Sequence, residues 1–206
     1  MASINTHLAI AKRYLELNLG KIVDEVAFYD GSVRPDLHPN KMESHYGERG
    51  ERNDMVKRHK EKVGLKKFLQ NNSIDNDELE GEFLHLYADD IYYNKMFSKE
   101  YLGSVDLSQF FEDHVYTFMK HESHLKQKYG IGHEMSSLKP ELDAAMETWL
   151  AGDYQRWGEG GPQGKLLFTQ EQLDEYIEYV ASVNLEKLQQ QILNKSFEMG
   201  DDNRQR

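Results

Sequence analysis

Residues 81–90 read GEFLHLYADD and lie inside a pattern that predicts an α-helix. The preceding residues 75–78, DNDE, are typical of a helix N-terminus, and apolar positions then recur every three or four residues. His85 and Asp89 stand four residues apart, so they share one face of the predicted helix. Because both groups are costly to bury without a partner, we examined what the rest of the chain places beside them.

Helical periodicity continues through nearly the whole chain, and no alternating strand pattern accompanies it. Further helices are expected at 5–19, 21–28, 51–69, 107–129, 140–154 and 169–194. Residues 30–40, DGSVRPDLHPN, contain one glycine and two prolines and are predicted to form a turn-rich loop. The sequence therefore predicts an all-α fold, with a single multi-helix domain over 1–198 and a disordered tail over 199–206.

Composition limits the classes of function. The chain has 206 residues, which suffice for one sizeable core, and a net charge of -11, which argues against strong nucleic-acid binding. It has no cysteine, so any metal must be held by histidine, aspartate or glutamate. No apolar run approaches the roughly 20 residues of a membrane span, and we expect a cytoplasmic protein. The sequence leaves the oligomeric state open.

Charge is distributed unevenly between two neighbouring segments. Residues 49–67 contain eight lysines and arginines, whereas residues 75–90 are acidic and contain neither. Two solvated helix faces that attract one another would explain this pattern. A basic rim beside an acidic, metal-collecting floor is the alternative explanation, and both interpretations stay open at this point.

Three pieces of sequence precede the His85/Asp89 pair. They are His7, on the apolar side of the first predicted helix, the segment GSVRPD at 31–36, and the pair SH at 44–45. In this order and spacing the pieces resemble the zinc-dependent phospholipase C family, an all-helical group related to the single-strand-specific zinc nucleases. The resemblance covers residues 6–97, about the first half of the chain.

The resemblance implies that five side chains are metal ligands: His7, Asp36, His45, His85 and Asp89. It implies one or two zinc ions, with Asp89 bridging to the second; manganese or iron would suit the same ligands. Zinc sites in enzymes use imidazole and carboxylate ligands and keep a position open for water, whose pKa falls to roughly 7. Asp36 is also the candidate catalytic residue, orienting or deprotonating that water.

The expected substrate is a small phosphoester, either a phosphodiester or a phosphomonoester. Arg34, Arg49 and Arg52 are the nearest candidates to bind its phosphate group. Glu82 and Asp90 lie close to His85 in sequence and are expected to support its ring by hydrogen bonding.

Other functions remain open on the sequence. The family's later His-x-x-x-Glu pair is missing, and His114 or His121 is either an extra ligand or an ordinary core or surface histidine. An HD-type metal phosphohydrolase would show a His-Asp dipeptide, which the chain lacks. The non-enzymatic alternative is a helical interaction protein whose metal site is structural or vestigial.

Overall fold

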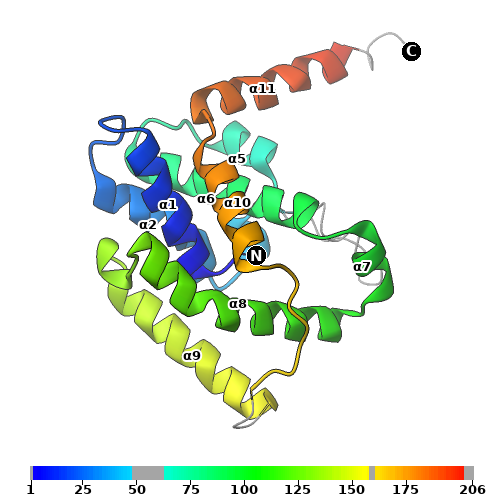
Figure 1. The fold of residues 1–206 in the computed structure, drawn as a ribbon. Coiled ribbons are helices and arrows are strands. Elements are labelled where there is room, and N and C mark those ends of the chain that lie inside the picture. The colour runs from blue at the N-terminus through cyan, green and yellow to red at the C-terminus, as the bar shows by residue number, and fades with distance from the viewer. Residues whose placement is uncertain (1, 48–62, 158–160, 202–206) are drawn as a thin grey trace.

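The computed structural model describes residues 2–47, 63–157 and 161–201, which form an all-α fold (Figure 1). The helices, in chain order, are α1 (Ile4–Leu17), α2 (Glu25–Leu37), α3 (Lys41–Ser44), α5 (Leu65–Asn71), α6 (Asp77–Lys95), α7 (Lys99–Ser104), α8 (Leu107–Tyr129), α9 (Lys139–Trp157), α10 (Gln170–Ala181) and α11 (Leu185–Asp201). Over the same ranges, extended backbone pairs only at one isolated bridge, between Tyr46 and Val63. The predicted all-α class is confirmed.

Helix α6 runs through the middle of the molecule, behind α1 and α10, while α11 extends away at one edge (Figure 1). It packs against α2, α1, α5 and α10, and α1 also contacts α8. The central part of α6 is buried on all sides, including Phe83, Leu86 and Tyr92. A side chain on the middle of α6 therefore meets protein whichever way it points.

None of the helices in the described ranges has the length and apolar content needed to cross a lipid bilayer.

Helices α2 and α6 approach each other through two glycines. A Cβ atom on Gly31 would lie 2.8 Å from the carbonyl carbon of Glu78, and one on Gly81 would lie 3.0 Å from that of Phe28. Neither distance leaves room for a methyl group, so main chain packs directly on main chain. This contact packs the middle of α2 on the first turns of α6 and places the Ser32 carbonyl beside His85.

The predicted loop at 30–40 is wrong as far as residue 37, because α2 continues to Leu37. The helix begins at the N-cap Asp24, whose side chain accepts a hydrogen bond from the Ala27 N–H. Pro35 lies in the last turn; it lacks the N–H that would bond the carbonyl four residues earlier, and the helix ends two residues after it. Packing of Gly31 on α6 supplies the tertiary stabilisation that the sequence pattern does not display.

Other boundaries differ as well. The long helix predicted at 169–194 is two helices, α10 and α11, separated at residues 182–184, although its predicted Thr169/Gln172 capping box is present. Helix α7 was not predicted. Of the basic helix predicted at 51–69, residues 51–62 lie outside the described residues and the remainder contributes to α5. Helix α11 continues to Asp201, and residues 202–206 of the predicted tail are not described.

Candidate metal centre

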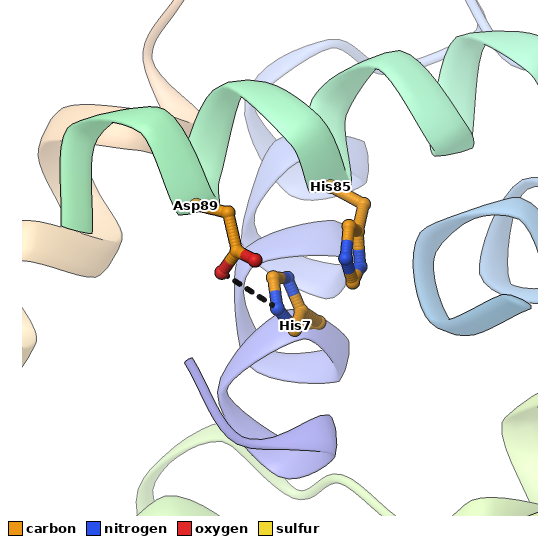
Figure 2. A group of neighbouring side chains, drawn as sticks. All are labelled: His7, His85 and Asp89. Atoms are coloured by element: carbon orange, nitrogen blue, oxygen red, sulfur yellow. Dashed lines mark ion pairs between the residues drawn. The ribbon is translucent and has the colours of Figure 1, made fainter. Parts of the chain in front are cut away.

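Three of the predicted ligands converge from two helices. His85 and Asp89 project from α6 toward His7 on α1 (Figure 2). All three are buried, with relative exposures of 1%, 0% and 1% for His85, Asp89 and His7. The rings of His7 and His85 stack with their centroids 3.7 Å apart. The inward orientation predicted for His7 and the shared face of His85 and Asp89 are therefore both present.

Asp36 at the end of α2 and His45 after α3 complete the cluster. The two carboxylates are arranged alike, because each turns one oxygen toward His7 and the other toward His45. Asp89 places Oδ1 3.4 Å from His7 Nε2 and Oδ2 3.2 Å from His45 Nε2. Asp36 places Oδ2 3.7 Å from His7 Nε2 and Oδ1 3.9 Å from His45 Nε2. Together with His85, the donor atoms form two overlapping groups that each suit a metal ion.

Hydrogen bonds outside the cluster fix the tautomers of two rings. The Ser32 carbonyl lies 2.8 Å from His85 Nδ1 and can only accept, so that nitrogen carries the proton. Ser44 Oγ donates to the Pro35 carbonyl at 2.9 Å and therefore accepts from His45 Nδ1, also at 2.9 Å. Both rings consequently direct an Nε2 lone pair into the cluster, where the two nitrogens lie 3.2 Å apart. Two such lone pairs repel unless a proton or a metal ion lies between them.

The charge state of the cluster also favours a cation. Burial lowers the pKa of His85 to about 3, so its ring is neutral at pH 7. Burial raises the pKa of Asp36, but electrostatic interactions with the neighbouring His85 ring, Lys41 and the His7 ring outweigh burial and hold the pKa below its usual value. For Asp89, burial is likewise outweighed by electrostatic interactions that include those with the His45 and His7 rings, which hold the pKa well below its usual range. Both carboxylates are therefore ionised.

Several buried atoms of the cluster lack a partner within the described part of the chain. They are Nδ1 and Nε2 of His7 and Oδ2 of Asp89; Asp89 Oδ1 accepts a hydrogen bond of 2.9 Å from the main-chain N–H of Ala2. Two ligands of one tetrahedral zinc ion, each about 2.0–2.1 Å from the metal, lie about 3.4 Å apart. The shorter separations in the cluster, 3.2 and 3.4 Å, match this geometry. The donor set therefore fits a divalent metal ion.

Of the predicted phosphate-binding arginines, the structure describes only Arg34. Its Nη1 lies 2.6 Å from Glu78 Oε1, and its side chain lies outside the cluster. Arg49 and Arg52 lie outside the described residues. The expectation that Glu82 or Asp90 supports His85 is wrong, because the Ser32 carbonyl accepts from the His85 ring instead. A main-chain acceptor on another helix leaves no signal in the sequence near His85.

His114 and His121 are not brought to the cluster. His114 Nδ1 lies 3.1 Å from the Tyr92 hydroxyl, and its ring packs on Phe118. His121 Nε2 donates to the Phe168 carbonyl at 2.9 Å. Neither histidine belongs to a group of metal-ligating atoms among the described residues.

Lys41 is a member of the site that sequence reasoning missed. Its ammonium group lies 3.0 Å from Asp36 Oδ1 and also donates to the Asp36 carbonyl. A lysine five residues after an aspartate carries no recognisable signal, since the turn after α2 alone brings the two together.

Comparisons of the chain with models of known families, with curated proteins and with solved structures find no match.

Proposed function

We propose that this protein is a metal-dependent phosphoester hydrolase related to the zinc-dependent phospholipase C family. One observation carries the proposal: three imidazoles and two ionised carboxylates converge in a buried cluster whose hydrogen bonds leave ring nitrogens and a carboxylate oxygen unpartnered. His121 and His124 each bond one ring nitrogen to a protein group, whereas both ring nitrogens of His7 lack a hydrogen-bond partner.

The formal charge of the donor set bears on the number of ions. Asp36 and Asp89 contribute two negative charges, and the imidazoles are neutral when they act as ligands. One divalent ion would make the centre neutral, whereas two would leave it positive and attractive to an anionic phosphoester. The paired arrangement of both carboxylates between His7 and His45 supports the two-ion form.

Each ligand has a defined part in this proposal. His7, His45 and His85 would hold zinc, or manganese or iron, together with the carboxylates of Asp36 and Asp89, which would also balance its charge. When bound, such an ion supplies a water of lowered pKa and stabilises negative charge on the phosphoryl oxygens. Asp36, whose Oδ1 is already bonded to Lys41, would orient the attacking water as an acceptor. Lys41 keeps that carboxylate ionised and in place.

A structural metal site is the second candidate, and the burial of the donors favours it. His7, His85 and Asp89 are at most 1% exposed and His45 is 2% exposed. A closed set of protein ligands is typical of structural zinc sites, whereas a catalytic site must admit substrate. The protein would then be a helical binding protein that the ion stabilises.

The test begins with elemental analysis of untagged protein, since an affinity tag of histidines binds metal itself. We expect one or two equivalents of zinc, manganese or iron, lost in the variant Asp89→Asn and retained in the control His124→Gln. His124 is a partly exposed histidine on α8 that is bonded to Asp174, outside the cluster. Wild-type protein without metal, even when folded in the presence of zinc, would overturn both candidates.

Hydrolysis separates the two candidates. The metal-containing protein is assayed with p-nitrophenyl phosphate and bis(p-nitrophenyl) phosphate, a monoester and a diester. Cleavage by the wild type and by His124→Gln, but not by Asp89→Asn, would support the hydrolase. Stoichiometric metal with no cleavage of either ester would favour the structural site, and equal cleavage by all three proteins would reveal a contaminating enzyme.

A further inference from the structure

A cavity of about 460 Å³ lies beside the metal centre. Helices α2, α3, α5 and α6 all contribute to its wall, through residues that include Arg34, Ser44, Lys67 and Glu82. Ser44 joins the cavity to the centre, because its hydroxyl is hydrogen-bonded to the His45 ring. A molecule that fills this space would lie next to the His45 side of the cluster.

Two cations line the cavity. The side chain of Arg34 is half exposed. Its contact with Glu78 uses only one of the five N–H donors of the guanidinium, so other donors are available to a ligand. Lys67 is exposed, and among the described residues no carboxylate forms an ion pair with it. The acidic chain does not attract anions at long range, so an anion bound here would be held at short range by these two cations, beside the Glu43 and Glu82 carboxyl groups that also line the hollow.

One part of the cavity lining, Tyr46, is held in an uncommon backbone conformation. Tyr46 has a φ angle of 56°, a value that non-glycine residues rarely adopt. The bridge to Val63 and a 2.9 Å hydrogen bond from the Gly64 N–H to the His45 carbonyl maintain it. The Tyr46 hydroxyl accepts from Asn72 at 3.1 Å, which leaves its own proton available to a ligand. Strain of this kind persists where surrounding contacts impose it, and it gathers at binding sites.

Most of the other lining side chains carry polar groups, acceptors as well as donors. Glu43 and Glu82 contribute carboxyl groups, Asn71 contributes an amide and His38 contributes an imidazole ring. Pro35 and the Tyr46 ring are the apolar side chains of the described lining. Carboxyl groups beside an anion site suit a ligand with hydroxyl or amino groups next to its phosphate.

We propose that this cavity is an anion-binding subsite for a water-soluble substrate, such as a phosphorylated sugar or nucleotide, and that Arg34 and Lys67 bind a phosphate group other than the one at the metal centre. The inference rests on the proposed function in one respect, because that function supplies the other phosphate group, the one at the metal centre. Anion binding by the cavity is measurable without hydrolysis. The substrate would carry two anionic groups, one for each site.

The experiment is isothermal titration of the protein as purified with pyrophosphate, a probe of the anion site. The variants Arg34→Gln and Lys67→Gln should each weaken binding at least about fivefold, since each removes a charge-assisted hydrogen bond. The control is Lys66→Gln, because Lys66 is an equally exposed neighbour on α5 that does not line the cavity. It should bind pyrophosphate as the wild type does.

Metal content is measured on the same samples and should be unchanged in all three variants. Normal metal content with no pyrophosphate binding, or with binding that neither cavity variant weakens, would overturn the inference and leave the proposed function intact. Pyrophosphate binding that depends on Arg34 and Lys67 in metal-free protein would support the subsite while the proposed function fails. Cosedimentation with phosphatidate vesicles that Lys67→Gln abolishes would instead place a lipid headgroup in the cavity and overturn the soluble substrate.

Discussion

Replacing Gly81 by alanine should push α2 away from α6. The added Cβ would lie 3.0 Å from both the Phe28 carbonyl carbon and the Ser32 main-chain nitrogen, and still closer to the Phe28 oxygen. These obstacles are backbone atoms, so no side chain can rotate away. Restoring ordinary contact requires the helices to separate by about 1 Å, which cores resist at a cost of about 1–3 kcal/mol.

The expected loss is partly offset by the better helix propensity of alanine, about 1 kcal/mol at most. Because main chain meets main chain, we place Gly81→Ala near the upper limit of the cost, with a net loss of about 2 kcal/mol. For a chain of this length that corresponds to a melting temperature about 4–8 °C lower. Metal affinity should fall as well, because Asp36 lies on α2 and His85 on α6.

Thermal unfolding followed by circular dichroism measures the effect, and Gly152→Ala is the matched control. Gly152 is an exposed glycine inside α9, where an added Cβ meets nothing within 4 Å. That substitution should stabilise the protein by about 0.5–1 kcal/mol, the usual gain for alanine in a helix. If Gly81→Ala melts at or above the wild-type temperature, the direct packing of α2 on α6 is refuted.

Three further predictions concern side chains. Ser44→Ala should lower metal affinity about tenfold, measured by competition with a chelator, because His45 Nδ1 loses its acceptor. Metal-free protein should lose stability as the pH falls from about 6.5, the pKa of an unfolded histidine, toward the pKa of about 3 for buried His85, since only the unfolded state takes up that proton. Asp113→Ala should cost about 3 kcal/mol in denaturant unfolding, because the buried carboxylate accepts from the Tyr101 hydroxyl and the Lys165 N–H.

Each of these has a contrary result. Unchanged chelator competition by Ser44→Ala would mean that the His45 tautomer does not matter for binding. For the pH experiment, protein refolded in chelator is melted between pH 7.5 and 5, and a slope that His85→Gln leaves unaltered would assign the titration to another group. An Asp113→Ala variant as stable as the wild type would show that water replaces the lost acceptor without cost.

Periodicity and capping predicted the regular helices well, because these signals are local. The limits predicted for α8 coincide with those observed, and the start of α6 follows its Asn76 cap. Residues 30–37 were misassigned for a physical reason: glycine and proline lower intrinsic helix propensity, and the packing that compensates comes from α6, about 50 residues away. Helix propensity describes an isolated segment, whereas the helical conformation of residues 30–37 depends on their tertiary contact with α6.

The same division holds at the site. The five ligand residues were predicted from the resemblance to a zinc-enzyme family that their order and spacing carry, and the structure brings them together; their binding of metal remains a prediction. The groups that hold these ligand residues in place were only partly predictable from the sequence. Ser44 adjoins its partner in sequence, whereas the Ser32 carbonyl and the Lys41 ammonium reach the cluster through the path of α2 and the turn after it. Main-chain acceptors are available at every residue, so sequence alone does not single one out.

The burial of the donors has a kinetic consequence. An ion cannot reach nitrogens and oxygens that solvent does not touch unless part of the chain opens first. Loading and release should therefore proceed at the rate of local opening, many orders of magnitude slower than the exchange of water around a free ion. The metal found in a purified sample would then be an ion that was present when the chain folded, and later dialysis would exchange it only slowly.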